Sequence, residues 1–495
     1  MPDAFVLFVG SLVPLFAVTL ALAAGHTGHE QIGTSIGTDL VIDSGYGDAG
    51  SAIANFNDAD GTWDQPVRVV DDGAGGTWVL GFHRPDSGEQ DSFAIAKLRA
   101  DGTPDAAYGT NGQLLATMGV TYINDAIVGG DGRFYVAGMY LSSPSANTEF
   151  AIACVELDGA ACAGFGDNGT VTIALAAPGF GSSATRVLYR DGALFAIGNT
   201  DPGGGNFGHS SAIAVAKLDA ASGALDATFG NAAGGAPGQS VFDLNLYAGG
   251  FDYANDAALS VDAGGEPIVL VAGSAQTTDN QSSAAYVLAF DAATGELDSG
   301  FGTGGVTYLP VQVGAHLDQV SATAVSANAE GRVLVAGNAN HDDVDFNIIS
   351  DVLLAALDAG GNVMPDFAGG GLTHVNVGFN SETTAIAERP NGDFVVTVQS
   401  NGLLPDEYNP FNLQSVVQFD ANGNGPTATV SLQFPSDPEQ SPLARPTSVF
   451  VDADNRVVVA GLRLWNYAHY PAPDFDFTVT RLVRDEIFAG GFEAQ

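Results

Sequence analysis

Residues 330–337 read EGRVLVAG, and residues 352–375 read VLLAALDAGGNVMPDFAGGGLTHV. Both segments contain apolar runs, and Asp, Asn and Gly separate these runs from one another. Short apolar runs bounded by turn residues are typical of β-strands that are covered on both faces. With the residues around them, the two segments predict four short strands, at Ala322–Ala327, Arg332–Gly337, Val352–Leu357 and Leu372–Val377.

The same pattern returns along most of the chain. The first segment recurs as DGRFYVAG from Asp131 and as DNRVVVAG from Asp454. Its last residue recurs with a period of about 63 residues. The matching positions are Gly81, Gly138, Gly198, Gly273, Gly337, Val398 and Gly461. Four-stranded units repeated at this period predict blades arranged around an axis.

The two ends of the repeat region complement each other. The last unit has three expected strands, near Thr447–Asp452, Arg456–Gly461 and Phe475–Leu482, and lacks a clear fourth. Residues Ser44–Phe56 match only the closing piece of a unit. Six whole units and one split unit predict an all-β fold, a seven-bladed β-propeller of four-stranded blades, with the N-terminal strand completing the last blade. Ring closure removes exposed sheet edges, whereas the alternative, an open solenoid of sheets, would need caps.

The repeat resembles a known one. Its pattern is Asp-Gly-(Arg/Lys)-φ-φ-Val-Ala-Gly, followed by φ-Ala-φ-Ala-φ-Leu-x-x-Asp-Gly-x-x-Asp-x-x-Phe-Gly-x-x-Gly, where φ is apolar. This pattern is similar to the bacterial delta-60 repeat over about residues 44–483, and it is weakest in the sixth unit, where GNGPTATVSLQF replaces the Phe-Gly element. The resemblance implies a propeller-like β fold in a bacterial protein of a kind that is often exported, and says little about activity.

The chain divides into four expected segments. Residues 1–23 are expected as a signal peptide, 24–43 as a linker, 44–483 as the propeller and 484–495 as a C-terminal tail. The apolar stretch before residue 24 carries no charge and ends in a small-x-small cleavage pattern, although no basic residue precedes it. An uncleaved membrane anchor is the alternative, because about 20 apolar residues can cross a bilayer. After cleavage we expect no membrane span.

Charge excludes some partners. The chain has 57 acidic and 15 basic residues, a formal net charge of −42. Such a polyanion is not expected to bind nucleic acid or anionic lipid, because both need a basic face. The acidity is consistent with solubility and with many Asp-containing turns. The alternative is binding of multivalent cations or adaptation to a salt-rich habitat.

Two cysteines are present, Cys154 and Cys162. Their closeness in sequence predicts a local disulfide in an exported protein, with two free thiols as the alternative. Two acidic segments predict calcium sites, because carboxylates at such spacing are oxygen ligands for Ca²⁺. The candidate ligands are Asp58, Asp60 and Asp64 in the first segment, and Asp342, Asp343 and Asp345 in the second. Turn chemistry is the alternative for both, and calcium is the cofactor that these acidic segments suggest.

Function is expected in the loops between second and third strands, because loops vary while repeats serve packing. Four histidines lie in these loops and offer a metal site as one hypothesis, with solvated side chains as the other: His83, His209, His341 and His469. An aromatic residue recurs in the units, and we expect it to pack between blades rather than to stack on sugars. These residues are Tyr46, Tyr108, Phe165, Phe229, Phe301 and Phe367.

The sequence therefore predicts an exported propeller that is a binding or structural scaffold, secreted, at the cell surface or in the periplasm. A glycan, a protein or a cation is the expected partner, and the chain is expected to be monomeric. No H-E-x-x-H motif is present, and no catalytic residue is assigned. The alternative is an exported hydrolase, lyase or quinone-dependent dehydrogenase, with its site at the axial mouth.

Overall fold

The computed structural model describes most of the chain after residue 34. The described ranges are 35–36, 40–56, 62–85, 90–141, 147–176, 179–203, 211–230, 236–244, 246–247, 250–277, 282–309, 318–342, 348–377, 381–403, 410–432, 444–465 and 474–484. All of them belong to one compact unit, Gln31–Gln495. The expected signal peptide and all but the first residue of the expected tail lie outside the described residues.

The all-β expectation is confirmed in these ranges, where the regular structure is β-strand apart from a 3-10 turn at Phe367–Gly369. The fifth unit shows how closely the pattern predicted the strands. Its observed strands are β20 (Asp318–Ala327), β21 (Val333–Asp342), β22 (Ile348–Leu357) and β23 (Leu372–Val375). β20, β21 and β22 extend beyond the predicted strands toward the loop between β21 and β22, whereas β23 ends two residues before its predicted end.

No helix in the described residues is long and apolar enough to span a bilayer.

Successive strands pair antiparallel in groups of four, and each group is named here by its first strand. The β4 group is β4 (Trp63–Asp71), β5 (Thr77–Arg84), β6 (Ser92–Leu98) and β7 (Gln113–Ala116). The β8 group is β8 (Tyr122–Val128), β9 (Phe134–Leu141), β10 (Thr148–Val155) and β11 (Thr170–Ile173). The β12 group is β12 (Ser182–Arg190), β13 (Ala193–Thr200), β14 (Ala212–Asp219) and β15 (Gln239–Phe242). The β16 group is β16 (Phe251–Val261), β17 (Pro267–Gln276), β18 (Ser282–Asp291) and β19 (Val306–Leu309). The β20 group consists of β20 to β23, with the bounds given above. The β24 group is β24 (Ser381–Glu388), β25 (Phe394–Leu403), β26 (Pro410–Phe419) and β27 (Ala428–Leu432).

The last group takes a strand from the N-terminal part of the chain. Its consecutive strands are β28 (Ala444–Val451), β29 (Val457–Trp465) and β30 (Asp474–Val483), and β3 (Ser51–Ala54) pairs antiparallel with β30. The hydroxyl groups of Ser51 and Thr480 share a buried hydrogen bond of 2.8 Å across this pairing. Two short strands from the expected linker also pair, β1 (Ser35–Ile36) with β27 and β2 (Val41–Ile42) with β30.

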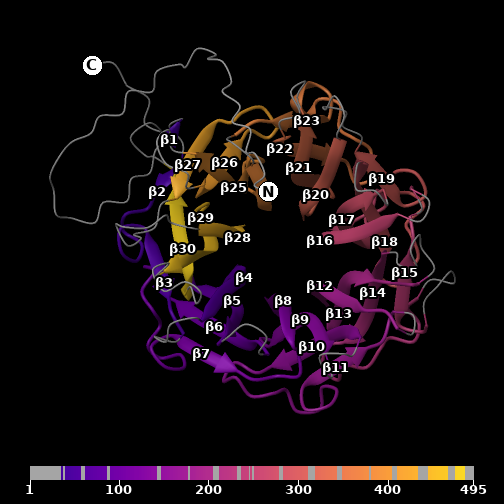
Figure 1. The fold of residues 1–495 in the computed structure, drawn as a ribbon, viewed down its shortest axis with the longest axis horizontal. Helices are drawn as coiled ribbons and strands as arrows, with labels where there is room; N and C mark the ends of the chain where they lie inside the picture. The colour runs from indigo at the N-terminus through magenta and orange to yellow at the C-terminus, as the bar shows by residue number, and fades with distance from the viewer. Residues whose placement is uncertain are drawn as a thin grey trace, which may run out of the picture. The chain divides into compact units, whose positions relative to one another are not determined.

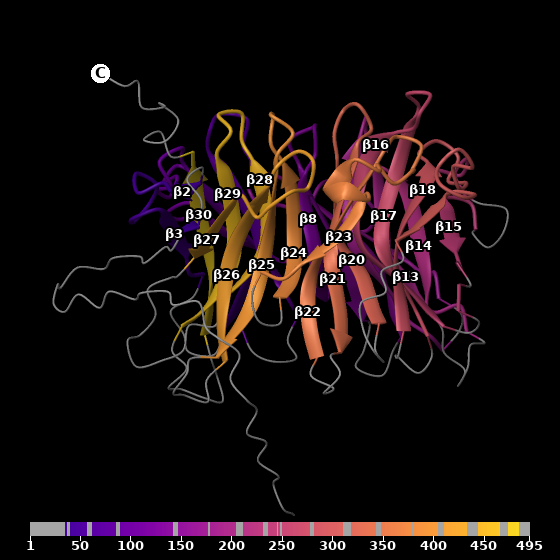
Figure 2. The same cartoon turned by 90° about the horizontal axis from the view of Figure 1, so that it is seen from above.

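Within this unit the groups follow one another around a central axis (Figure 1). The first strand of each group lies nearest the axis and the short fourth strand lies outside. First strands contact one another in chain order from β4 to β28, and β28 also contacts β4. Short parallel pairings join β18 to β20 and β30 to β4, which is why some groups merge into larger sheets. Figure 2 shows the strands running between two faces that carry the loops.

The recurring aromatic residues pack between groups, as predicted. Five of them are fully or almost fully buried: Tyr46, Phe165, Phe229, Phe301 and Phe367. Phe301 shows how the packing works, because its ring lies against Gly361 in a turn of the next group. Gly361 has a φ of +73°, and a Cβ added there would lie 2.7 Å from the Phe301 ring. Glycine is needed for both the backbone conformation and the close approach.

The predicted disulfide is confirmed. Cys154 at the end of β10 is bonded to Cys162, with their Cα atoms 5.4 Å apart. Cys154 and Cys162 are both buried, and they lie in the hydrophobic cluster between the β8 and β12 groups. The bond therefore ties a turn to the core at one interface between groups.

Candidate functional site

Every first strand that surrounds the axis contains a β-bulge at the same place. In each one the register with the second strand shifts by a residue, and the extra residue is half-buried. The bulged residues are Val67, Asn124, Thr185, Asn255, Thr323, Thr384 and Thr447. A bulge redirects one side chain out of the regular alternation, and bulges are frequent beside functional sites.

The glycine that marks each repeat in the sequence lies opposite this bulge. Gly337 of β21 pairs with Ala322, the residue just before the bulged Thr323. A Cβ added to Gly337 would lie 1.9 Å from the Ser321 carbonyl oxygen, so the two strands approach too closely for a side chain. The β24 group departs from this rule, because Val398 takes the place of the glycine. The glycine was therefore a sequence signal for the bulge as well as for the hairpin.

Four of the bulged side chains bond to the next group. Each donates to the carbonyl oxygen of the residue that precedes the next bulge. The bonds run from Asn124 Nδ2 to Ala184 O (2.7 Å), from Thr185 Oγ1 to Ala254 O (3.3 Å), from Asn255 Nδ2 to Ala322 O (2.9 Å) and from Thr323 Oγ1 to Thr383 O (3.0 Å). The bulge thus links the β8, β12, β16, β20 and β24 groups in one direction around the axis.

The residue after the bulge is charged in four consecutive groups. These residues alternate in sign: Arg68, Asp125, Arg186 and Asp256. Arg186 Nε donates to Asp256 Oδ1 at 2.7 Å. Burial alone lowers the pKa of the Arg186 guanidinium, but the carboxylates of Asp256 and Asp125 outweigh burial and raise it. Asp256 also accepts from the Val325 amide, so that it bonds to the groups on both sides of it.

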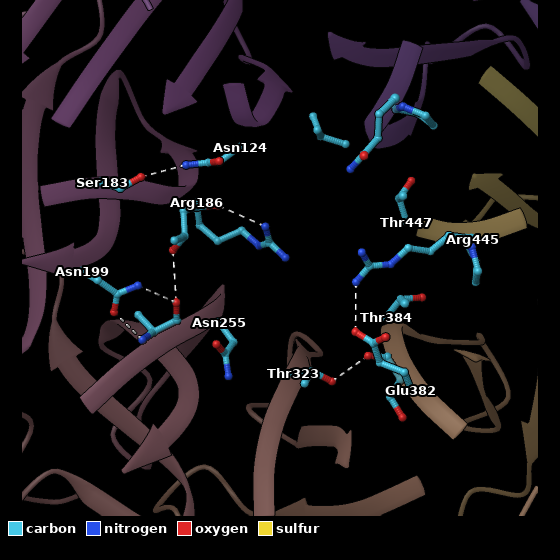
Figure 3. Close-up of a pocket in the computed structure, with 17 residues that line it drawn as sticks. Asn124, Ser183, Arg186, Asn199, Asn255, Thr323, Glu382, Thr384, Arg445 and Thr447 are labelled. Carbon is cyan, nitrogen blue, oxygen red and sulfur yellow. Dashed lines mark hydrogen bonds and ion pairs between the residues drawn. The ribbon is translucent and has the colours of Figure 1, made fainter. Parts of the chain in front are cut away.

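A cavity of about 510 Å³ lies at the level of the bulges (Figure 3). It is lined by residues of every first strand from β4 to β28, together with Asn199 of β13. Its lining is rich in hydroxyl and amide side chains, and its three charged residues are Arg186, Glu382 and Arg445. We call this space the axial cavity. A cavity of this size suits a small ligand that is held by a few polar groups.

Two of the charged residues form an exposed ion pair. Arg445 Nη2 donates to Glu382 Oε1 at 3.0 Å, and these side chains remain 46% and 52% exposed. In Figure 3 the Arg186 and Arg445 side chains reach into the axial cavity from opposite walls. An exposed pair of this kind adds little to stability, so rearranging it for a ligand costs little.

A second cavity of about 870 Å³ follows farther along the same strands. Apolar residues of β16, β20, β24 and β28 line it, together with the ion pair between Arg332 and Glu388, whose atoms are 2.8 Å apart. Burial raises the pKa of the Glu388 carboxyl, and Arg332 only partly opposes this effect. Glu388 Oε2 is buried and has no hydrogen-bond partner among the described residues.

The predicted calcium ligands fall in different places. Asp64 is fully buried in β4, accepts from the Phe56 amide at 3.0 Å and lies 2.6 Å from His83 Nδ1. His83 is therefore engaged in a buried pair within its own group. Asp58, Asp60, Asp343 and Asp345 lie outside the described residues, as do His209 and His469. Asp342 and His341 lie in β21, without a described side chain. In the described part of the chain no cluster of His, Cys, Asp and Glu could hold a metal, and the calcium sites remain predictions.

Sequence reasoning missed the bulged residues, although a signal for them exists. Val67-Arg68, Asn124-Asp125 and Thr185-Arg186 begin 13 or 14 residues before the repeat glycine of their unit, and Asn255-Asp256 begins 18 residues before it. Only the pairing register shows that the first member of each pair is the bulged residue, which lines the axial cavity. Groups of four antiparallel strands around an axial cavity define the class of β-propellers.

No family model matches this chain, and no curated protein matches it. Solved structures with a similar fold include the β-propeller domain of the trilobed protease of Pyrococcus furiosus, at 8% identity and a TM-score of 0.39, covering 86% of this chain and 94% of that one. An α-L-arabinanase of Penicillium chrysogenum in complex with arabinobiose has 11% identity and a TM-score of 0.40, with 90% and 98% covered. An ulvan lyase has 12% identity and a TM-score of 0.38, with 86% and 95% covered. Likenesses this distant carry no argument about what this chain binds.

Proposed function

We propose that this chain is an exported β-propeller of the delta-60 repeat kind that acts as a binding scaffold and holds a small polar ligand in the axial cavity. The observation that supports it most directly is the set of equivalent bulges. Each bulge turns one side chain out of the strand alternation and toward a shared cavity. Six of the seven bulged residues are Asn or Thr, which are suited to hydrogen bonding with a polar ligand.

We further propose that the propeller has seven blades and is closed by the N-terminal segment. Seven first strands carry the bulge, and β3 supplies the outer strand of the β28 group. The junction between the last and first groups is bonded in the same manner as two other junctions, because the Val69 amide donates to Ser448 Oγ at 3.1 Å. Asp125 and Asp256 accept the corresponding amides of Val187 and Val325 at their own junctions.

Export is part of this proposal. A buried disulfide between Cys154 and Cys162 is typical of proteins that fold in an oxidising compartment. The uncharged apolar stretch before residue 24 has the pattern of a signal peptide. We propose a monomer that is secreted or held at the cell surface or in the periplasm, with a glycan, a protein or a cation as the partner, and a saccharide best suited to the axial cavity.

The test is ligand binding to the full chain by saturation-transfer NMR, with a panel of monosaccharides and disaccharides as probes. Thr447→Trp fills part of the axial cavity, and Leu115→Trp adds the same side chain on the outer strand β7, where Leu115 is 43% exposed. We expect binding to be lost in Thr447→Trp and kept in Leu115→Trp. Binding that is unchanged in Thr447→Trp, or no binding of any probe, would contradict the proposal.

An exported hydrolase or lyase is the second candidate, and one observation favours it. Glu388 lines the second cavity, and burial raises the pKa of its carboxyl. Such a carboxyl can stay protonated at higher pH and donate a proton to a leaving group. Turnover of p-nitrophenyl glycosides that is lost in Glu388→Gln and kept in Glu330→Gln, on the same cavity, would support this candidate. Equal turnover in both variants would count against it.

A further inference from the structure

One wall of the axial cavity has already used most of its side-chain hydrogen-bond donors. The side-chain amides of Asn124 and Asn255 donate to Ala184 O and Ala322 O, and the Thr323 hydroxyl donates to Thr383 O. Among the described residues, Oδ1 of Asn124 and Oδ1 of Asn255 have no hydrogen-bond partner. An amide oxygen has two lone pairs, and a hydroxyl that donates can still accept. This wall therefore offers acceptors, which suit a ligand with several hydroxyl groups.

The two arginines offer the opposite chemistry. Arg186 uses Nε on Asp256 and Nη1 on the Thr185 carbonyl, and Arg445 uses Nη2 on Glu382. Within the described part of the chain, Nη2 of Arg186 and both Nε and Nη1 of Arg445 remain without a partner. Both guanidinium groups reach into the cavity (Figure 3). Free guanidinium donors favour an anionic acceptor, and a planar carboxylate matches their geometry.

Taken together, the geometry points to a polyhydroxy acid as the ligand, that is, a sugar carrying a carboxylate. This inference rests on the proposed function of the axial cavity as a ligand site. The hydroxyl groups donate to the oxygens of Asn124, Asn255 and Thr323, and the carboxylate accepts from the free N–H groups of Arg445 and Arg186. The cavity of about 510 Å³ is within the usual range of small-ligand sites, ~300–1,000 Å³.

Glu382 makes the inference testable, because its substitution should change the ligand affinity in the opposite direction to substitution of Arg445. Its carboxylate bonds the same guanidinium that would receive the ligand, at 3.0 Å. A ligand carboxylate bound to Arg445 would lie close to Glu382 and be repelled by it. Removing the charge of Glu382 should therefore tighten binding of an acid, whereas removing the charge of Arg445 should weaken it. A merely structural role of the pair would make the two substitutions act in the same direction.

The experiment is titration calorimetry of the full chain with glucuronate, its neutral amide glucuronamide, and glucose. We expect glucuronate to bind at least about tenfold more tightly than glucuronamide, a difference of ~1.4 kcal/mol. Arg445→Gln should abolish this preference, and Glu382→Gln should increase it. Arg99→Gln is the matched control, because Arg99 is 56% exposed and forms a similar surface pair with Asp105.

The outcomes separate the two proposals. If glucose and glucuronamide bind as tightly as glucuronate, the preference for an acid is wrong while the saccharide site stands. If none of the three binds, and no sugar of the wider panel binds, both proposals are overturned. If glucuronate is preferred but Arg445→Gln and Arg99→Gln leave the preference equally unchanged, the acid is bound elsewhere and the assignment to the axial cavity is wrong.

Discussion

Arg68 of β4 donates hydrogen bonds to both carboxylate oxygens of Asp125 in the neighbouring group, with Nη2 2.8 Å from Oδ1 and 2.6 Å from Oδ2. Asp125 has no exposed surface, and its Oδ2 also accepts from the Val187 amide at 3.0 Å. One carboxylate therefore joins the β4, β8 and β12 groups. Such a pair adds stability only while both partners are present, because a buried charge left alone is costly.

Asp125→Ala should consequently destabilise the protein strongly. We expect a loss of about 3–5 kcal/mol in the free energy of unfolding, the usual effect of breaking a buried pair. Chemical denaturation monitored by tryptophan fluorescence measures it. Glu382→Gln removes a partner from an exposed pair and should cost less than about 1 kcal/mol. Similar losses in the two variants would show that burial of Asp125 has no energetic role.

Gly361→Ala tests the packing of one group on the next. Alanine at this position must adopt a positive φ and also meets the ring of Phe301. We expect a loss of about 2–4 kcal/mol, from backbone strain and the steric conflict. Gly265→Ala is the control, because Gly265 has a φ of +86° and nothing within 4 Å of an added Cβ. The control should cost only about 1 kcal/mol, and equal costs would refute the role of Phe301.

Removal of the N-terminal strands tests ring closure. A chain that lacks residues 1–56 loses β1, β2 and β3 and leaves the edge of β30 unpaired. We expect its thermal transition to broaden, with a midpoint lower by about 10 °C or more. A chain that lacks only residues 1–34 keeps all three strands and should unfold like the full chain. Closure by β3 would be wrong if the two deletions unfolded at the same temperature.

The Glu388 carboxyl should make stability depend on pH in an unusual direction. Its pKa is raised in the folded state, so the folded protein holds this proton more tightly than the unfolded chain does. The group favours folding below its unfolded pKa, and this contribution is lost as the pH rises through the folded pKa. Glu388→Gln should thus gain stability relative to the natural chain as the pH is raised from 4 to 7. Denaturant titrations at several pH values measure the difference, and a flat difference would contradict the expectation.

The repeat allowed the fold to be predicted from the sequence, whereas the candidate site could not be predicted from it. Apolar runs and Gly-rich turns located the strands of the fifth unit to within a few residues at most ends, because strand and turn chemistry are local. The recurring aromatic residues were correctly interpreted as packing. The pairing of Cys154 with Cys162 was also predicted correctly, since the two are only eight residues apart.

The axial cavity depends on contacts between residues that are far apart in the chain. Asn124 and Thr384 share a cavity only because bulges in different groups turn them toward the same axis. No spacing within one unit shows this, since a bulge is a property of the register between two strands. The search for function in the loops between second and third strands also overlooked the strands themselves. His83 shows the difference, because this residue was expected in the first loop but lies in β5, where it is buried against Asp64.

The direction of the bonds between groups bears on how such a chain can grow by gene duplication. Each unit from the β8 to the β20 group carries a donor toward its successor, and each from the β12 to the β24 group offers a carbonyl to its predecessor. A duplicated copy inserted within this arc would find matching partners on both sides. Elsewhere, Thr384 and Thr447 bond within their own groups, and Val67 has no donor to offer. Lineages of this protein should therefore gain and lose units within the arc, while the remaining units stay constant in number.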